Sequence, residues 1–519
     1  MRRVVPAAIV VIACALTAST ASARVLRVGI YNGMKGQFGS IQAAVDAAKP
    51  GDWILVGPGD YKEQGVKGAS ESAGVLIRTA RLHLRGMNRN RVIVDGTKRG
   101  AAPCSSRASD QVVARKGRNG IVVFKAGVVY IENLTACNFL TSRNAEEGNE
   151  IWWNGGDGSG KIGMGSWWGN YITATSTFSR GVNPPYADYG IFVSNSRGAG
   201  LVDHSYASNM GDSAYYIGAC PDCNAVLTHA HAQNSSLGYS GTNSGGHLII
   251  ENSEFDHNKA GPTTNSQNND DAPSPQNGAC PGHQPGPLGN GICEIWRDNR
   301  IHDNNNPNVP GNGVGGVAGD IPVGTGLVLG GGQNVEVLHN RIFNNNSWGV
   351  VVSDFPDQEQ PPPIARCEGG DYLVRPPAAN QLCYYHAFGN VVSGNAFANN
   401  GSFKNPTDGD IVLYAQTLTP GNCFTGNTDP KGLSSEPAAI QSPPYDTCGA
   451  ANGSTSAAAT AQLACALKLG SCPPGTTYPK PSRTFKLAMP PRQATMPNPC
   501  AGVPRNPWCP TAVKRRRAH

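Results

Sequence analysis

Acidic, imidazole and phenol side chains gather in two adjacent stretches near the middle of the chain. Asp203 directly precedes His204, and His229 follows 25 positions after His204. Asp212 and Tyr216 lie between the two histidines in the sequence. Imidazole and carboxylate groups exchange protons near neutral pH, and a phenol can donate a proton. These five residues form the candidate catalytic set, because they could remove a proton from an activated carbon and protonate a leaving oxygen.

The same stretch of the chain is repetitive. The segment Gly-Ile-Phe-Val at 190–193 is followed 24 positions later by Ala-Tyr-Tyr-Ile at 214–217. The repeats end in asparagines, namely Asn209, Asn234 and Asn258. A period in the low twenties, built of short β segments between Gly, Asn and Ser turns, is typical of a β-solenoid. One rung cannot bury its own apolar face, so the rungs must stack and bring equivalent positions into columns.

The register returns further along the chain, at 298–304, 339–345 and 394–400. Each of these segments has Asn at its second and last positions and an apolar residue at its fourth. From about residue 38 to 430 the chain resembles the right-handed parallel β-helix proteins of the pectin-lyase-like superfamily. This resemblance implies an all-β solenoid with a short amino-terminal capping helix and an irregular carboxyl-terminal tail. The fold carries lyases, hydrolases, epimerases and non-enzymatic adhesins, so fold alone leaves the function open.

Two columns decide how the histidines are interpreted. One column is apolar at almost every level, which predicts that it points inward and that His231 is a core histidine; its members are Tyr206, His231, Phe255, Ile301, Ile342 and Phe397. The column two positions earlier holds His204, His229, Ser253, Asn299, Asn340 and Asn395. Its asparagines predict a ladder of stacked amides. A structural interpretation therefore places His204 and His229 at the start of that ladder, whereas the catalytic interpretation groups them with Asp203.

The resemblance also implies a reaction. Lyases and epimerases of the superfamily remove the C5 proton of a uronate with a basic side chain, often beside a calcium ion. A cation or donor stabilises the carboxylate, and an acid protonates the leaving oxygen. A hydrolase would need paired carboxylates on one face, for which Asp203 and Asp212 are the obvious pair. Strand alternation predicts that Tyr215 faces the core and Tyr216 faces outward. No catalytic signature of the superfamily transfers residue by residue.

Two further features could bind ligands. The pairs Trp152–Trp153 and Trp167–Trp168 could be flat platforms for sugar rings, or could pack an inserted hairpin onto the solenoid. Asp270 and Asp271, in an Asn-Asn-Asp-Asp run, could bind calcium through oxygen ligands, or could simply be solvated.

The ends and interruptions of the repeat give the expected organisation. Residues 1–23 are expected to be a signal peptide, because Arg2-Arg3 precede an apolar run and small residues precede Arg24. A lipid anchor at Cys14 is the alternative. The β-helix should span 24–430, and residues 40–48 should form the capping helix. Four loop insertions are expected, and a Cys- and Pro-rich extension should follow; these segments are 138–170, 262–293, 305–325, 354–388 and 431–519.

Cysteine usage points to an oxidising compartment. Removing the signal peptide leaves 14 of the 15 cysteines, an even number that favours disulfides. Connectivity does not follow from sequence, but five near pairs are plausible: Cys220 with Cys223, Cys280 with Cys293, Cys367 with Cys383, Cys465 with Cys472, and Cys500 with Cys509. The close pair Cys220 and Cys223 could also be a redox motif or half of a zinc site.

Composition limits the partners. The net charge of +6 is modest for 519 residues and forms no basic stripe, so nucleic acid is not expected. No second apolar run is long enough for a membrane span. We therefore expect a secreted β-helix protein that binds an extracellular acidic polysaccharide, with β-elimination or epimerisation as its reaction if it is an enzyme. The competing class is a non-catalytic glycan-binding or partner-binding surface protein. A copper-handling β-helix is disfavoured by only 7 Met residues and no His-rich tract.

Overall fold

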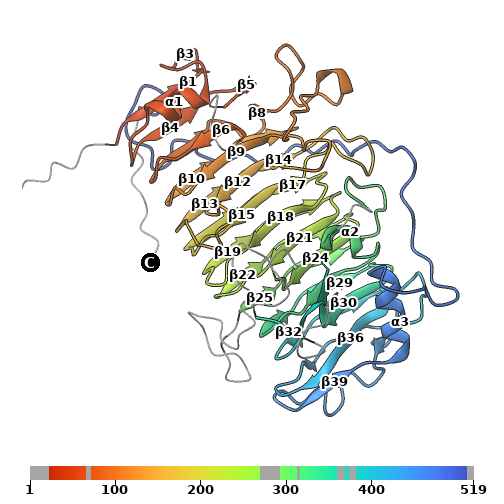
Figure 1. Ribbon diagram of the computed structural model, residues 1–519. Helices are drawn as coiled ribbons and strands as arrows, with labels where there is room; N and C mark the ends of the chain where they lie inside the picture. The colour runs from red at the N-terminus through yellow and green to blue at the C-terminus, as the bar shows by residue number, and fades with distance from the viewer. Residues whose placement is uncertain are drawn as a thin grey trace, which may run out of the picture.

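The chain folds as a right-handed parallel β-helix made of three long parallel sheets (Figure 1). The computed structural model describes residues 23–65, 72–268, 291, 293–312, 316–358, 367, 369–372 and 382–510. Each rung contributes one strand to the first sheet, one to the second and one to the third, and the next rung repeats this order. The expected fold class is confirmed.

The bounds of the elements follow this order. The first sheet consists of β1 (Val25–Val28), β4 (Trp53–Val56), β7 (His83–Gly86), β10 (Val129–Glu132), β13 (Trp167–Asn170), β16 (Gly200–Asp203), β19 (Ala225–Thr228), β22 (Leu248–Glu251), β25 (Glu294–Arg297), β28 (Val335–Leu338), β34 (Val391–Ser393) and β37 (Cys423–Thr425). The second sheet consists of β5 (Gly59–Tyr61), β8 (Val92–Asp95), β11 (Thr135–Cys137), β14 (Thr173–Thr175), β17 (Tyr206–Ser208), β20 (His231–Gln233), β23 (Glu254–Asp256), β26 (Arg300–His302), β29 (Arg341–Phe343) and β35 (Ala396–Ala398). The third sheet consists of β6 (Ala73–Ile77), β9 (Asn119–Phe124), β12 (Ile151–Asn154), β15 (Ile191–Ser194), β18 (Ser213–Gly218), β21 (Leu237–Thr242), β24 (Ala260–Asn265), β27 (Leu327–Gly330), β30 (Trp348–Ser353), β36 (Gly409–Leu418) and β38 (Ser435–Glu436). The remaining elements are β2 (Ile30–Tyr31), β3 (Met34–Lys35), β31 (Phe355–Asp357), β32 (Asp371–Tyr372), β33 (Cys383–Tyr385), β39 (Asn452–Ser454), α1 (Ile41–Ala47), the 3₁₀ turn η1 (Ala108–Asp110), α2 (Val317–Asp320) and α3 (Ala457–Ala466).

The core lies inside the solenoid, where alternate residues of every strand meet. In the third sheet Ile151, Ile191 and Tyr215 pair in register, and all three are buried. Tyr215 faces this core, as predicted, and Tyr216 points to the opposite face of its strand. Because every rung repeats the same alternation, the inward columns form one continuous apolar core.

The second sheet corrects the predicted inward column. Tyr206 pairs with His231, but His231 pairs with Glu254, and Phe255 pairs with Ala232. The successive spacings are therefore 25 and 23 residues, and a fixed period of 24 misaligns the strands by one position. A slip of one residue moves a side chain to the other face of a strand. His231 is thus not a core histidine: it lies on the outer face, with 30% of its side chain exposed.

Stacked asparagines hold the turns together, as the sequence predicts. Asn340 is fully buried, and its Oδ1 accepts from the backbone N and from Nδ2 of Asn299, at 3.0 Å each. Its Nδ2 donates to Trp296 O and to Asn395 Oδ1. Ser253 continues this ladder, but His204 and His229 do not, because they lie one residue earlier in the turn. The expectation that these histidines begin the ladder is wrong, for the same reason of register.

The predicted cap covers the amino-terminal end. Helix α1 begins after Ser40, whose side chain accepts a hydrogen bond from Ala43 N, and it buries Ile41, Ala44 and Val45. An exposed end would leave apolar core and strand edges open to water. Helix α3 lies in the expected Ala-rich stretch, with Ser456 as its N-cap.

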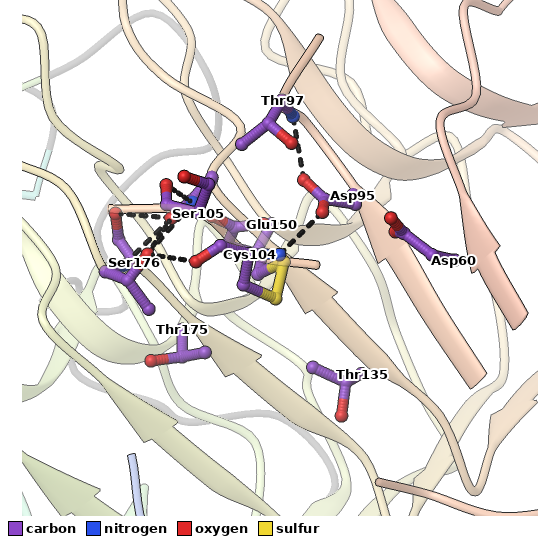
Figure 2. Close-up of a disulfide and its surroundings, with 12 residues drawn as sticks. Asp60, Asp95, Thr97, Cys104, Ser105, Thr135, Glu150, Thr175 and Ser176 are labelled. Atoms are coloured by element: carbon purple, nitrogen blue, oxygen red, sulfur yellow. Dashed lines mark hydrogen bonds between the residues drawn. A yellow bond between two sulfur atoms is a disulfide. The ribbon is translucent and has the colours of Figure 1, made fainter. Parts of the chain in front are cut away.

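The insertions differ in part from expectation. The segment 138–170 contains two regular rung strands, β12 and β13, so its tryptophans belong to the sheets and not to an inserted hairpin. The segment 354–388 contains the small antiparallel sheet of β31, β32 and β33. An unexpected loop, 96–118, is fastened to β11 by the disulfide Cys104–Cys137 (Figure 2). Asp95 accepts from Thr97 N and Cys104 N beside this disulfide.

Six disulfides are found among the described residues: Cys104–Cys137, Cys220–Cys223, Cys367–Cys383, Cys423–Cys448, Cys465–Cys472 and Cys500–Cys509. Four of these confirm expected pairs. Cys293 is also disulfide-bonded, whereas Cys280 lies outside the described residues, as do Cys14 and residues 1–22 of the expected signal peptide. This many disulfides fits a compartment outside the reducing cytosol. Among the described helices, none combines the length and apolar character needed to cross a membrane.

The carboxyl-terminal residues 470–510 form a strap that runs back along the solenoid from α3 toward the amino-terminal end (Figure 1). Asn209 Nδ2 donates to Ala488 O, and Thr495 Oγ1 donates to Asn133 Oδ1. Asn209 follows a strand of the second sheet and Asn133 precedes one. The strap therefore passes from one edge of the second sheet to the other near its amino-terminal end.

We expect the substitution Asn340→Ala to lower the free energy of unfolding by about 3 kcal/mol, because it leaves buried backbone groups of Asn299 and Trp296 without partners. Urea denaturation followed by circular dichroism measures the change. Arg341→Ala, at the exposed neighbouring position, should change stability by less than about 0.5 kcal/mol. Equal stability of the two variants would contradict the role of the ladder.

Candidate functional site

Asp203, His204 and His229 meet at the turn between the first and second sheets. Asp203 Oδ1 lies 2.7 Å from His204 Nδ1 and 3.1 Å from His229 Nδ1. The exposed fractions of the three side chains are 26%, 41% and 55%. The sequence predicted this grouping, and we call it the turn cluster. Two imidazoles and a carboxylate at an open surface could exchange protons or bind a metal ion.

Local backbone conformation aims the two histidines outward. His204 and His229 occupy the same turn position in successive rungs, and both have positive φ, 49° and 46°. Most residues avoid this conformation, but Asn, Asp and His adopt it more readily. The ring of His204 stacks between Tyr171 and His229, with centroid separations of 4.7 Å on each side. The stacking fixes the ring planes without burying the rings.

Asp212 and Tyr216 lie at the other edge of the second sheet. Asp212 follows β17 and precedes β18, whereas Asp203 precedes β17. The predicted catalytic set is therefore divided between two places, and Asp203 and Asp212 do not form one carboxylate pair. Asp212 instead adjoins Asp188: burial, with the negative charge of Asp212, raises the pKa of Asp188 well above its ordinary value.

Tyr216 belongs to an aromatic group on the third sheet. Its ring packs edge-on against Tyr189 and Phe192, with centroids 5.4 Å and 4.7 Å away. Burial and the charge of Asp212 raise the pKa of Tyr189 well above its ordinary value. These phenols therefore stay protonated at neutral pH and act as hydrogen-bond donors.

The four tryptophans do not form one platform. Trp153 and Trp167 have no exposed surface and pack in the core, so a glycan cannot reach them. Trp152 stacks on Phe192 on the third sheet, and Trp168 stacks on the first sheet at the end of a ring column that contains Trp53, His83 and Tyr130. Trp152 and Trp168 therefore offer separate, half-buried surfaces on different sheets. The candidate calcium ligands Asp270 and Asp271 lie outside the described residues.

The outer face of the second sheet carries a group that the sequence reasoning missed. Asp256 is almost buried, and its two carboxylate oxygens hold two imidazoles. Oδ1 lies 2.7 Å from His231 Nε2, and Oδ2 lies 2.5 Å from His257 Nδ1. Gln233 Nε2 also donates to Oδ2. Burial alone would raise the pKa of Asp256, but these hydrogen bonds outweigh it and hold that pKa at about 2.

The next rungs extend this polar face. His302 Nε2 lies 3.0 Å from Glu254 Oε1, and His302 Nδ1 lies 2.7 Å from Asp303 Oδ2. Arg300 approaches Glu254 at 3.5 Å with 52% of its side chain exposed, and it pairs in register with the exposed Arg341. Imidazoles, carboxylates and guanidinium groups thus alternate along one open strip.

The strap separates a covered part of this face from an open part. Tyr206, in the rung nearest the strap, is 1% exposed, although it points outward. One rung later His231 is 30% exposed, and His257 is 59% exposed. We call the open group of Asp256, His231 and His257 the dyad site. The one signal that could have located it in the sequence is the alternation of 25 and 23 residues between His231 and its neighbours.

Comparisons with known proteins support the fold and no more. No family model matches the chain, and no curated protein matches its sequence. Among solved structures, the A-module of mannuronan C-5 epimerase AlgE4 from Azotobacter vinelandii is 13% identical, with a TM-score of 0.42, covering 75% of this chain and 90% of that one. Pectate lyase Pel9A is 14% identical, with a TM-score of 0.38 and coverages of 78% and 76%. The tailspike protein of E. coli bacteriophage HK620, in complex with a pentasaccharide, is 11% identical, with a TM-score of 0.40 and coverages of 75% and 57%. At these values the likenesses carry no information about activity. The fold itself is the pectin-lyase-like right-handed parallel β-helix.

The pKa of Asp256 leads to a prediction about stability. A carboxylate whose folded-state pKa of about 2 lies below the ordinary 3.8 stabilises the fold above about pH 4, and this contribution is lost as the pH falls toward 2. Asp256→Asn should therefore lower the free energy of unfolding by about 2 kcal/mol at pH 7, and its difference from the wild type should close toward pH 2. Urea denaturation at a series of pH values tests this. Asp298→Asn, at an exposed turn position, should follow the wild type throughout; a pH-independent defect in Asp256→Asn would contradict the assignment.

Proposed function

We propose that the protein binds an extracellular acidic polysaccharide along the open face of the second sheet and abstracts the C5 proton of a uronate there. The observation that carries this proposal is the dyad site, in which one nearly buried carboxylate holds two partly exposed imidazoles. The outcome is β-elimination if a leaving group departs, or epimerisation if the proton returns to the other face of the carbon.

Each residue of the dyad site has a role in this scheme. Asp256 accepts from Nε2 of His231, which leaves Nδ1 of that ring to act as the base. The second imidazole, His257, carries the proton that the leaving oxygen or the carbanion needs. A carboxylate with a pKa of about 2 stays ionised, so it stabilises whichever imidazole is protonated.

Positive charge on the following rungs suits an anionic chain. Arg300 and Arg341 occupy the same column in successive rungs, and both side chains are exposed. Neighbouring strands in a sheet are about 4.8 Å apart, so the column presents cations at regular intervals along the solenoid axis. Guanidinium groups bind carboxylates through two parallel hydrogen bonds. Export of the chain is part of the proposal and is consistent with its disulfides.

A non-catalytic glycan-binding protein is the second candidate. The observation that favours it is that the imidazoles on this face already contact carboxylates: His231 and His257 contact Asp256, and His302 contacts Glu254. A carboxylate favours the protonated form of a neighbouring histidine. The face would then serve as a cationic binding surface without a free base.

The test of proton abstraction is deuterium uptake. The protein is incubated in D₂O with pectate, alginate and glycosaminoglycans, with and without calcium, and loss of the H5 signal is followed by proton NMR. Ultraviolet absorbance of unsaturated uronate distinguishes elimination from epimerisation. We expect turnover on one of these polymers, reduced at least about 100-fold in His231→Ala and in His257→Ala.

His339→Ala is the matched control, because His339 lies on the same solenoid outside the dyad site, and it should keep full activity. Turnover that survives in His231→Ala would contradict the assignment of the base. Absence of turnover on every polymer, together with glycan binding that weakens in Arg300→Ala and at high salt, would establish the binding protein instead.

A further inference from the structure

The turn cluster supports an inference that is separate from the dyad site. We propose that Asp203, His204 and His229 form a binding site for a divalent transition-metal ion of the Zn²⁺ type. One carboxylate and two imidazoles make up a frequent ligand set for such ions, with a remaining position taken by water or by substrate.

The donor atoms already converge. One carboxylate oxygen of Asp203 and the Nδ1 atoms of both histidines all lie within 4.8 Å of one another. Zinc bonds of about 2.0–2.2 Å at tetrahedral angles place ligand atoms about 3.3 Å apart. The contacts from Asp203 Oδ1 to the two histidines, 2.7 Å and 3.1 Å, are slightly shorter than this separation. Small rotations of side chains at an exposed turn are enough to admit the ion.

The hydrogen bonding of the cluster is incomplete. His229 Nδ1 makes hydrogen bonds with Asp203 Oδ1 and Thr228 Oγ1. His204 Nδ1 is shielded from solvent and lies close to the same carboxylate oxygen, yet it has no partner in hydrogen-bond geometry. A shielded nitrogen without a partner is costly. A metal ion between the two nitrogens and the carboxylate would satisfy all three donor atoms.

The ligands are held in place before any ion arrives. The ring of His204 is stacked between Tyr171 and His229. Beneath it, the buried side chain of Arg89 donates from Nη1 to His204 O and to Ala494 O of the strap. The guanidinium group thus fixes the turn to the carboxyl-terminal strap. Preorganised ligands lose little conformational freedom when they bind an ion.

The ligand types select the metal. Calcium and magnesium prefer sites made mainly of oxygen atoms, with six or more ligands for calcium. Imidazole suits zinc, copper, cobalt and nickel. The exposed fractions of 26–55% leave the outer side of the cluster open to solvent, so the ion would keep a position for water or for an oxygen of a bound ligand.

The experiment is a metal titration of the full, untagged protein after chelator treatment. Co²⁺ is added while visible absorbance is followed, because a tetrahedral cobalt site absorbs far more strongly than hydrated cobalt; Zn²⁺ binding is then measured by calorimetry and by competition with Co²⁺. We expect one saturable ion per chain. Asp203→Asn and His229→Ala should each weaken the affinity at least about 10-fold.

His339→Ala is the matched control. His339 occupies the same turn column as His204 and His229, with φ of 56°, but it is not part of the three-residue cluster. Its substitution should leave the affinity unchanged, and circular dichroism should show that all three variants are folded. Absence of saturable binding would overturn the proposal and leave the cluster a hydrogen-bonded stack. Binding that persists in both Asp203→Asn and His229→Ala, or that falls equally in His339→Ala, would overturn it as well.

Discussion

The structure depends on the backbone pairing of parallel strands from one rung to the next. Neighbouring strands lie about 4.8 Å apart, so each side chain meets its equivalent in the rungs before and after it. Apolar columns on the inside give the core, and asparagine columns at the turns satisfy buried backbone groups. The same stacking on the outside determines which charged and imidazole groups come into contact. A shift of one position in one rung would rearrange all of these columns.

Outside the core, this stacking places histidines in two kinds of position. His231 lies in a strand, where pairing with its neighbour brings it to a carboxylate of the following rung. His204 and His229 lie at a turn with positive φ, where their rings project outward and stack on each other. The strand position gives a histidine held by a nearly buried carboxylate, which suits proton transfer. The turn position gives exposed nitrogens that converge on one oxygen, which suits an ion.

The carboxyl-terminal strap connects these two places. It passes over the second sheet near the amino-terminal end and covers the rungs before His231, while the rungs that follow remain open. It also fixes the turn below His204 through Arg89. Residues nearly 300 positions away in the sequence thus mark one end of the open face and fix one of its edges. The strap contains no repeat, so its path follows only from its contacts with the solenoid.

The sequence by itself determined the repeat, the capping helix after Ser40, the asparagine ladders and several of the disulfides, because each of these depends on residues at short or regular spacing. It also indicated that Asp203, His204 and His229 would meet, since adjacent rungs bring equivalent turns together. Only the tertiary structure decided that His231 faces outward toward Asp256, that Asp212 lies apart from Asp203, and that Trp153 and Trp167 are buried. The physical reason is the length of each turn. Packing of the rungs sets whether a repeat takes 23, 24 or 25 residues, and a difference of one residue exchanges the inside of a strand for its outside.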